Sequence, residues 1–404
     1  MSRIEEMIRE LCPNGVEYKK LGDILNYEHP TKYIVKSTEY DNSYSIPVLT
    51  AGQTFILGYT NEDEGIYEAS KDHPTIIFDD FTTSFHWVDF NFKIKSSAMK
   101  MLRPKTSNVS FRYIYYAMRC IRFEAVDHTR HWISKYSQFE VPVPPLAIQN
   151  EIVNILDKFT ELEAELEAEL EARRKQYEYY RNKLLNFNEF HPPPQKIEVK
   201  WLTMSEVFEI KNGYTPSKAK PEYWTNGTIP WFRMEDIRTN GRILEDSIQH
   251  ITPEAVKGGR LFPANSIILA TTATIGEHAL IIADSLANQQ FTNLSIRKSL
   301  ADELDMKFFF YYMFIVDEWC KNNTNTSGFE SVDMVKFKKL QIPIPPMKEQ
   351  QRIVAILDKF ETLVNDISEG LPAEIAARRQ QYEYYRDKLL TFKRKEDAKI
   401  QPCC

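Results

Sequence analysis

Several segments of the chain combine short hydroxyl side chains with cations and aromatic rings. Lysine and arginine bind phosphate oxygens, and small polar side chains hydrogen-bond the edges of bases. Together these segments predict a surface that binds nucleic acid, although each residue taken alone is also an ordinary surface residue. The candidates in the first half are Thr31, Lys32, Tyr33, Lys36, Thr82, Thr83, Ser84, His86, His128, Arg130 and His131. Those in the second half are Thr215, Ser217, Lys218, Lys220, Arg233, Arg238, Thr271, Thr272 and Thr274.

The motifs of the common catalytic sites do not occur in the sequence. It lacks the Asn- or Asp-Pro-Pro-aromatic loop expected of an amino-methyltransferase and the Gly-x-x-x-x-Gly-Lys-Ser/Thr phosphate loop. The triplet Glu198-Val-Lys200 matches half of a nuclease signature, but such triplets arise by chance in any charged chain. The 5 cysteines lack zinc spacing and predict reduced thiols. We therefore expect no catalytic residue, cofactor or metal in this chain.

Elements that repeat along the chain must position the candidate residues. The pentapeptide Ile-Leu-Asp-Lys-Phe occurs at 155–159 and again at 356–360, and each copy precedes a Gln-Tyr-Glu-Tyr-Tyr-Arg segment. Residues 172–187 match residues 377–392 at 13 of 16 positions, whereas the parts ahead of each repeat differ from one another. This pattern predicts a constant helical frame that carries two variable domains.

Size and charge fit this organisation. At 404 residues the chain is too long for one ordinary core, and 43% apolar content is ample for two. The six glutamates between residues 161 and 171 account for the whole net charge of −6, so the rest of the chain is neutral on balance. Basic residues can therefore still gather on one face elsewhere. The longest apolar run, at 308–316, is about half the length of a membrane span, and we expect a cytoplasmic protein.

The predicted fold class is α+β. Apolar runs at 75–78 and 266–269 indicate buried strands, and residues 111–118 and 306–313 indicate equivalent apolar helices. We expect two globular domains separated by two long antiparallel coiled-coil helices, related by a pseudo-two-fold internal repeat. The predicted boundaries are a first domain at 1–145, a first helix and central spacer at 146–187, a linker at 188–195, a second domain at 196–346, a second helix at 347–392 and a tail at 393–404.

An apolar stripe along each long helix predicts that the two helices pack together. It consists of Ile148, Ile152, Ile155, Phe159, Leu162, Leu166, Leu170, Tyr177, Tyr180 and Leu184 in the first copy, and of Ile353, Ile356, Phe360, Leu363, Ile367, Leu371, Tyr382, Tyr385 and Leu389 in the second. Proline-rich segments at 141–145 and 342–346 predict rigid, extended joints before the helices. Gly370-Leu-Pro372 predicts a kink or a short loop in the second helix.

With these motifs the chain resembles the specificity subunit of type I restriction-modification systems over almost its whole length. The resemblance rests on the paired Pro-x-Pro-Pro, Gln-x-x-Ile-Val-x-Ile-Leu-Asp-Lys-Phe and Arg-x-Gln-Tyr-Glu-Tyr-Tyr-Arg segments. The second half adds Gly213-Tyr-Thr-Pro-Ser-Lys218 and Tyr223-Trp224, which the first half lacks. The repeated Leu-Glu-Ala-Glu unit at 162–172 resembles the spacer of the IC class.

The resemblance implies two target-recognition domains that each read one half of a bipartite, asymmetric DNA site. It also implies that the repeated helices recruit two modification subunits, and that catalysis belongs to partners. Modification subunits would use S-adenosylmethionine to methylate adenine, and restriction subunits would use ATP and Mg. Candidates for partner contact are Asp157, Lys158 and Arg181 in the first copy and Asp358, Lys359 and Arg386 in the second.

Two other functions stay open at the level of the sequence. A cytoplasmic coiled-coil adaptor that binds proteins would explain the frame and the acidity, but not the Thr/Lys/Arg loops, and salt-dependent DNA binding separates the two readings. A nuclease or methyltransferase fused to a reader domain conflicts with the missing motifs.

Overall fold

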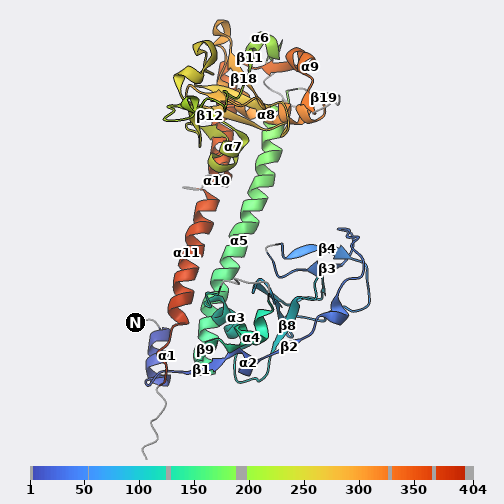
Figure 1. The fold of residues 1–404 in the computed structure, drawn as a ribbon, viewed down its shortest axis with the longest axis vertical. Helices are drawn as coiled ribbons and strands as arrows, with labels where there is room; N and C mark the ends of the chain where they lie inside the picture. The colour runs from blue at the N-terminus through green and yellow to red at the C-terminus, as the bar shows by residue number, and fades with distance from the viewer. Residues whose placement is uncertain are drawn as a thin grey trace, which may run out of the picture. The chain divides into compact units, whose positions relative to one another are not determined.

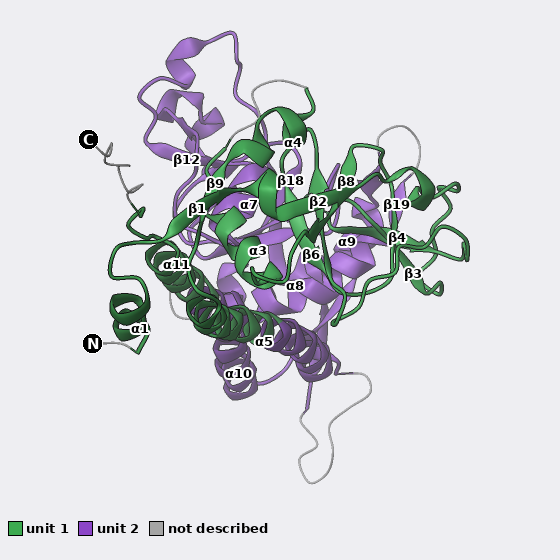
Figure 2. Ribbon diagram, turned by 90° about the horizontal axis from the view of Figure 1, so that it is seen from below, with its two compact units in different colours: residues 1–167, 375–404 green, residues 168–374 purple. Residues whose placement is uncertain are grey.

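The computed structural model describes residues 3–52, 54–123, 129–187, 198–325, 330–365 and 370–395. His128, Ile367, the predicted linker at 188–195 and the terminal Cys403-Cys404 pair lie outside these ranges. The chain forms two compact units, namely residues 1–167 with 375–404, and residues 168–374 (Figure 2). Because each unit takes in a part of both long helices, this division differs from the predicted one, which kept the helices apart from the globular domains.

Unit 1 contains short strands and helices ahead of a long helix (Figure 1). In chain order they are α1 (Arg3–Leu11), β1 (Glu17–Lys20), α2 (Leu21–Ile24), β2 (Leu25–Glu28), η1 (Thr31–Tyr33), β3 (Ile46–Leu49), β4 (Ile56–Thr60), β5 (Thr75–Asp79), β6 (Phe85–Val88), β7 (Lys93–Ile94), β8 (Met99–Pro104), α3 (Phe111–Arg119), α4 (His131–Ser134), η2 (Tyr136–Gln138), β9 (Glu140–Val143) and the first part of α5 (Leu146–Leu185).

The main sheet of unit 1 has the strand order β2-β8-β5-β6, and a smaller sheet has the order β4-β3-β7. Apolar side chains of β5 alternate between two cores. Ile76 and Phe78 face the core that contains α3, while Ile77 faces the core of the smaller sheet. The strand predicted at 75–78 and the helix predicted at 111–118 are both confirmed as β5 and α3.

Unit 2 repeats this mixture of strands and helices. Its elements are the last part of α5, β10 (Lys200–Thr203), α6 (Met204–Val207), β11 (Phe208–Asn212), η3 (Pro221–Tyr223), β12 (Ile229–Phe232), α7 (Met234–Asn240), β13 (Ile243–Leu244), β14 (His250–Ile251), η4 (Pro253–Ala255), η5 (Lys257–Gly259), β15 (Ser266–Ala270), β16 (His278–Ile281), β17 (Leu286–Ala287), β18 (Phe291–Ile296), η6 (Lys298–Leu300), α8 (Met306–Lys321), β19 (Thr324–Asn325), β20 (Ser331–Val332), α9 (Met334–Lys339), β21 (Gln341–Ile344), α10 (Met347–Asn365) and the start of α11 (Leu371–Leu389).

The main sheet of unit 2 has the order β11-β18-β15-β16-β13, and α8 contributes Phe308, Phe309 and Phe310 to its core. A second core contains Trp231, with Trp224 packed against it at 4.9 Å between ring centroids. The strand predicted at 266–269 and the helix predicted at 306–313 are confirmed as β15 and α8. The α+β class is thus confirmed in both units.

Each proline-rich joint is a strand that pairs with the entry segment of its own half. In unit 1, β9 pairs with β1 in antiparallel register, with Pro142 opposite Tyr18. In unit 2, β21 pairs with β10, with Pro343 opposite Trp201. Proline lacks an amide donor and is tolerated where a strand has a free edge, which suits these two-stranded ribbons. The equivalent pairing supports the internal repeat.

Residues 393–395 of the predicted tail also belong to unit 1. The backbone N–H of Val16 donates to Lys393 at 2.9 Å, and Lys395 donates back to Val16 at 2.8 Å. Arg394 forms an ion pair with Glu140 at 2.6 Å. The last described residues of the chain are therefore held beside Val16, which leads into β1.

The predicted antiparallel packing of the two helix copies is found within each unit. In unit 1, Phe159 of α5 stacks on Tyr385 of α11 at 5.7 Å, while Arg379 forms ion pairs with Glu163 and Glu167 further along α5. As residue numbers rise along α5 from Phe159 to Glu167, those of the contacting α11 residues decrease from Tyr385 to Arg379. The two helices are therefore antiparallel.

The same aromatic contact recurs in unit 2 with the two copies exchanged. There Phe360 of α10 stacks on Tyr177 at 6.2 Å and on Tyr180 at 6.0 Å. In unit 1, Phe159 lies 6.4 Å from Tyr382, the counterpart of Tyr177. The two repeats therefore use the same pair of positions for their aromatic contact, with the two copies exchanged.

The second helix copy is divided between α10, which ends at Asn365, and α11, which begins at Leu371. Pro372 lies in the first turn of α11, where its missing N–H is tolerated. Residues 366–369 between them lie outside the described residues. Within the described part of the chain, no helix is both long and apolar enough to cross a membrane.

The long helices also have a second apolar face that the predicted stripe missed. Leu156 and Leu357 are fully buried in the cores of units 1 and 2, each beside the aspartate of the repeated pentapeptide. Leu363, which was placed on the stripe, is 37% exposed, while its neighbour Val364 is buried. A stripe drawn for helix pairing alone omits the face that packs on the globular domain.

Candidate nucleic-acid interface

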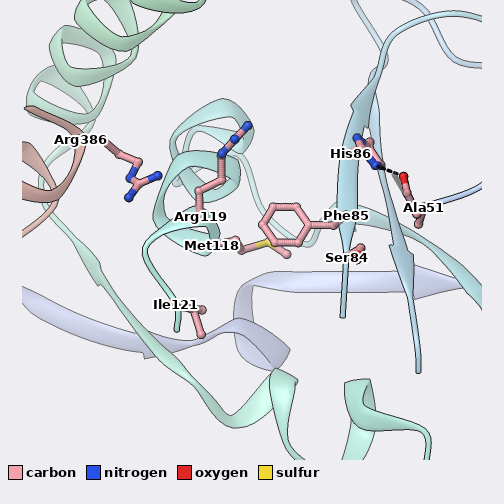
Figure 3. A pocket seen from close by; sticks show the side chains of 9 residues that line it. Ala51, Ser84, Phe85, His86, Met118, Arg119, Ile121 and Arg386 are labelled. Atoms are coloured by element: carbon pink, nitrogen blue, oxygen red, sulfur yellow. Dashed lines mark hydrogen bonds between the residues drawn. The ribbon is translucent and has the colours of Figure 1, made fainter. Parts of the chain in front are cut away.

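A pocket of about 380 Å³ in unit 1 gathers cationic and polar side chains from several elements; we call it pocket 1 (Figure 3). Its lining consists of Ala51, Gly52, Ser84, Phe85, His86, Met118, Arg119, Ile121 and Arg386. The predicted residue Ser84 immediately precedes β6 and His86 lies on it, whereas Arg119 ends α3 and Arg386 lies on α11. The tertiary structure therefore joins two predicted nucleic-acid contacts with two arginines that the sequence did not connect to them.

The two arginines of pocket 1 have different partners. Arg386 donates to the Asp387 carboxylate at 2.9 and 2.6 Å, which offsets part of its charge. Arg119 donates to the Tyr115 hydroxyl at 3.1 Å, a neutral partner that leaves its charge uncancelled. Although burial alone lowers the pKa of Arg119, the nearby tyrosines raise it overall. Pocket 1 thus holds a permanent cation that fits a phosphate oxygen.

His86 is held in place by its neighbours. Its Nε2 atom lies 3.1 Å from the carbonyl oxygen of Gly52, and its ring lies 4.7 Å from that of Phe55. When Nε2 carries the proton, it donates to Gly52, and Nδ1 is then an acceptor. The imidazole is therefore fixed at the edge of the pocket.

The turn before β6 presents only part of the predicted Thr82-Thr83-Ser84 cluster. The carboxylate of Asp79 accepts hydrogen bonds from the backbone of Phe81 and Thr82, both at 2.9 Å, and closes the turn. Thr82 is exposed, and its hydroxyl lies 3.1 Å from that of Ser84. Thr83 is buried and adopts a φ of 59°, so we correct its prediction as a contact residue.

The prediction for His131 is also corrected, because this side chain is fully buried. Its backbone N–H donates to the carbonyl of Asp80 at 2.8 Å, and Asp80 also accepts from the Trp132 N–H. The same carboxylate pairs with the buried Lys100 at 3.0 Å. His131 therefore belongs to the folded interior that supports β5, whereas the neighbouring Arg130 is exposed.

Two more predicted residues of unit 1, Lys32 and Tyr33, line a second pocket of about 720 Å³ together with Arg103 and others. Lys32 pairs with Glu28 at 2.9 Å and lies 4.8 Å from the Tyr33 ring centroid. Hydrogen bonds with Tyr33 and Glu28 raise the pKa of Lys32, so it stays cationic. Thr31 is exposed beside it.

Lys36 is exposed as well and lies 3.5 Å from the carboxylate of Glu64. Exposed pairs at this distance are weak, so the Lys36 ammonium can exchange that carboxylate for a phosphate.

In unit 2 the predicted loop at 214–220 is anchored by its aromatic neighbours. The indole of Trp224 donates to the Ser217 carbonyl and that of Trp231 to the Tyr214 carbonyl, both at 3.1 Å. Thr215 donates to the side chain of Gln289. These contacts leave Ser217, Lys218 and Lys220 on the exposed side of the loop. Lys220 lies over the Tyr223 ring at 4.9 Å.

The two predicted arginines of unit 2 flank the short helix α7. Arg233 precedes it, is half-buried and pairs with Glu235 at 3.0 Å. Arg238 lies on α7 and is exposed. The Arg238 side chain is thus exposed on α7, and that of Arg233 is partly exposed at its start.

Of the predicted threonines at 271–274, Thr271 is corrected to an internal residue. It is 6% exposed, and its hydroxyl lies 2.9 Å from that of Thr292. Thr272 and Thr274 are half-buried and follow β15, next to Ala273 with a φ of 63°. They remain candidates at the end of that strand.

Asp157 and Asp358 were predicted to contact partner subunits, but both carboxylates contact the globular part of their own unit. Asp157 accepts from Arg112 at 2.8 Å and from the Tyr116 hydroxyl. Asp358 accepts from Lys307 and Tyr311 in the same arrangement. The structure therefore gives these aspartates contacts within their own unit, while their side chains stay 33% and 35% exposed, and partner contact remains a prediction.

The other predicted partner contacts divide into exposed and packed residues. Lys158 and Lys359 follow the aspartates and are exposed in both copies. Arg181 packs its guanidinium on the Phe314 ring at 4.0 Å, and Arg386 lines pocket 1. The sequence reasoning missed Tyr179 and Tyr384, equivalent positions that are 60% and 63% exposed. Their signal was a tyrosine outside the apolar stripe in both copies.

Among the described residues, no group of three or more His, Cys, Asp or Glu side chains could hold a metal ion. Cys12, Cys120 and Cys320 are free thiols, in line with the prediction of reduced cysteines. Burial raises the pKa of Cys120 to about 11 and that of Cys320 to about 12, which makes both poor nucleophiles near neutral pH.

Comparison with known proteins agrees with this geometry. Residues 13–172 and 196–377 match the family described as the type I restriction modification DNA specificity domain. The chain is 46% identical over 98% of its length to the type I restriction enzyme EcoR124I/EcoR124II specificity subunit of Escherichia coli, of which it covers 99%. It is 32% identical over 93% of its length to the putative specificity subunit S.HindORF215P of Haemophilus influenzae, of which it covers 96%.

Two solved structures share the fold. The type I restriction-modification S subunit from M. genitalium aligns with a TM-score of 0.54 at 15% identity, over 93% of this chain and 96% of that one. A chain from a structural study of type I complex assembly aligns with a TM-score of 0.59 at 16% identity, over 94% and 98%. The chain therefore belongs to the type I restriction-modification DNA specificity family, with one specificity domain in each half.

Proposed function

We propose that the chain is the DNA-reading subunit of a type I restriction-modification complex and recognises a bipartite, asymmetric sequence. The observation that carries this proposal is the combination of an equivalent frame with different surfaces in the two units. Each unit repeats the paired entry strands and the aromatic helix contact. The candidate contact residues, by contrast, differ in type and position between the units. Each unit then reads its own half-site.

The contacts to DNA divide by chemistry. Arg119 and Arg386 in pocket 1 bind backbone phosphate, and the exposed cations Lys32, Lys36 and Arg130 extend this surface in unit 1. In unit 2 the exposed cations are Lys218, Lys220 and Arg238. The polar side chains between these cations read base edges. They are Thr31, Tyr33, Thr82, Ser84 and His86 in unit 1, and Thr215, Ser217, Arg233, Thr272 and Thr274 in unit 2.

The chemistry on DNA belongs to partner subunits. Modification subunits hold S-adenosylmethionine and methylate adenine, and restriction subunits use ATP and Mg. The outer face of the repeated helices supports two identical partners, because Tyr179 and Lys158 have equivalents in Tyr384 and Lys359. An open hollow of about 670 Å³ lies beside Tyr384 on α11 and gives space for a partner side chain. Two equal surfaces on one chain fit two copies of one modification subunit.

The test is co-expression of the chain with its modification subunit, followed by single-molecule sequencing of methyladenine in the host genome. We expect methylation at a split, asymmetric motif that depends on this chain. Purified complex should bind a duplex that carries the motif, with an affinity that falls steeply as salt rises. Methylation that persists without the chain, or a complex that forms but ignores DNA, would refute the proposal and favour a protein-binding adaptor.

A further inference from the structure

Each long helix carries one carboxylate that is held by a cation and a phenol from its own unit. In unit 1, Asp157 Oδ1 of α5 accepts from Arg112 Nε at 2.8 Å and from the Tyr116 hydroxyl. In unit 2, Asp358 of α10 accepts from Lys307 Nζ at 2.8 Å through Oδ2 and from the Tyr311 hydroxyl at 2.6 Å through Oδ1. We call these groups the unit 1 clamp and the unit 2 clamp.

The two clamps share their construction although the surrounding sequences differ. In both, the phenol follows the cation by four residues, so the two donors lie on the same face of α3 or α8. The aspartate is the third residue of the repeated pentapeptide, and the leucine before it is fully buried. Each helix, α5 in unit 1 and α10 in unit 2, therefore presents one apolar and one anionic side chain to the globular part of that unit.

The carboxylates of both clamps are partly shielded from water. The Asp157 and Asp358 side chains are 33% and 35% exposed, so about two thirds of each is shielded from water. Burial and the Asp157 hydrogen bond raise the pKa of Tyr116, and burial and Asp358 raise that of Tyr311. Both phenols thus remain donors over the whole physiological range.

The unit 1 clamp continues to the strand that carries the candidate contacts. The Arg112 guanidinium lies over the Trp87 ring, 4.7 Å from its centroid, as well as over Tyr115 and Tyr116. Trp87 is on β6 next to His86, which lines pocket 1. A chain of direct contacts therefore runs from the Asp157 carboxylate on α5 through α3 to β6, the strand that carries the candidate contact residue His86.

From this geometry we infer that Asp157 and Asp358 are positioning residues. Each aspartate fixes the candidate DNA-contact surface of its own unit against the long helix on which the aspartate lies. The inference rests on the proposed function, because it assigns each clamp to the recognition of one half-site. Loss of the carboxylate charge leaves the cation without its counter-charge and gives the phenol a weaker, neutral acceptor. The candidate DNA-contact surface of that unit alone then becomes less well placed. Discrimination should then fail at one half-site and persist at the other.

The experiment uses the full chain in complex with its modification subunit. Asp157→Asn and Asp358→Asn keep the side-chain size and remove the charge. Methylation rates are measured on the cognate duplex and on duplexes with one changed base in either half-site. We expect Asp157→Asn to lower discrimination roughly tenfold at one half-site only, and Asp358→Asn to do so at the other half-site only.

Matched variants separate positioning from other roles. Asn150→Ala and Gln351→Ala change exposed residues at equivalent positions of the two helices and should leave discrimination unchanged. Arg112→Lys gives the unit 1 clamp the cation found in the unit 2 clamp, and it should act at the same half-site as Asp157→Asn with a smaller effect. It also serves in place of Asp157→Asn if that variant does not fold.

Three outcomes would overturn the inference. Both asparagine variants could affect the same half-site, both could lose affinity for the modification subunit with discrimination intact, or neither could change discrimination. The second outcome would return these aspartates to partner contact. A wild-type complex without bipartite methylation would instead reject the proposed function itself, so the two failures are distinguishable.

Discussion

Arg181 and Arg386 occupy the same position in the repeated helices but have different surroundings in the two units. In unit 2, the Arg181 guanidinium covers the Phe314 ring at 4.0 Å. In unit 1, Arg386 lines pocket 1 together with Arg119, the α3 residue at the position that corresponds to Phe314. A phenylalanine thus packs against the repeated arginine in unit 2, whereas an arginine gives unit 1 a second cation. The repeated frame stays constant while single residues of the variable domains decide its local chemistry.

The buried polar pairs of the two units differ in the same way. Unit 1 buries Lys100 against Asp80 at 3.0 Å, and unit 2 buries His278 against Asp317 at 2.6 Å. Lysine keeps a charge that must be compensated in the interior, whereas histidine also exists as a neutral ring. We therefore expect the two units to tolerate loss of their aspartate to different degrees.

The largest expected effect is that of Asp80→Ala, which leaves the Lys100 charge buried and unpaired. It should lower the free energy of opening of unit 1 by about 3 to 5 kcal/mol. Asp317→Ala should cost unit 2 about 1 to 3 kcal/mol, because it leaves the buried Nδ1 atom of His278 without its hydrogen-bond partner. Hydrogen exchange resolved by segment measures each unit separately. Exposed Asp72→Ala is the control, and equal losses for Asp80→Ala and Asp317→Ala would contradict the comparison.

A second expected effect concerns pocket 1. Arg119→Phe gives unit 1 the residue type found in unit 2 and removes the uncancelled cation. DNA affinity of the complex should fall about tenfold, and the slope of log affinity against log salt should drop by about one. Lys19→Ala, which removes a cation from β1 outside pocket 1, is the matched control. An unchanged salt slope for Arg119→Phe would remove pocket 1 from the DNA-binding surface.

The smallest expected effect concerns a feature that the two helix copies share, the exposed tyrosines Tyr179 and Tyr384. Tyr179→Ala and Tyr384→Ala should each weaken binding of one modification subunit by about fivefold, about 1 kcal/mol. The double variant should combine both losses, while Lys175→Ala, on the same helix, should have little effect. Titration of the chain with modification subunit, followed by mass measurement of the complexes, resolves one and two bound copies. A loss that follows only one tyrosine would show that the two surfaces are not equivalent.

Residue patterns predicted the elements better than the contacts. The runs at 75–78 and 266–269 form β5 and β15 because consecutive β-branched and apolar residues mark strands buried on both faces. The proline-rich joints were predicted to be extended, but their pairing with the entry strands was not, since the two partners are more than 100 residues apart. Sequence spacing carries little information about such non-local pairing.

The candidate site shows the same limit. Ser84, His86 and the exposed lysines reach the surface as expected, whereas Thr83, His131 and Thr271 are buried. Residue type cannot distinguish a surface histidine from one enclosed beside Asp80, because burial depends on what packs above it. Asp157 and Asp358 were predicted as partner contacts on the repeated helices, and nothing in the sequence indicated their hydrogen bonds to α3 and α8.

The sequence by itself determined the duplication, the α+β class, the reciprocal helix pairing and the family. Each of these depends on periodicity or on repeated motifs, which are local properties of the chain. Only the tertiary structure decided that Arg119 and Arg386 share pocket 1 with Ser84 and His86, and that each repeated aspartate clamps its own unit. The physical reason is that pockets and clamps form where distant segments pack together, and that packing is absent from the pattern of any single segment.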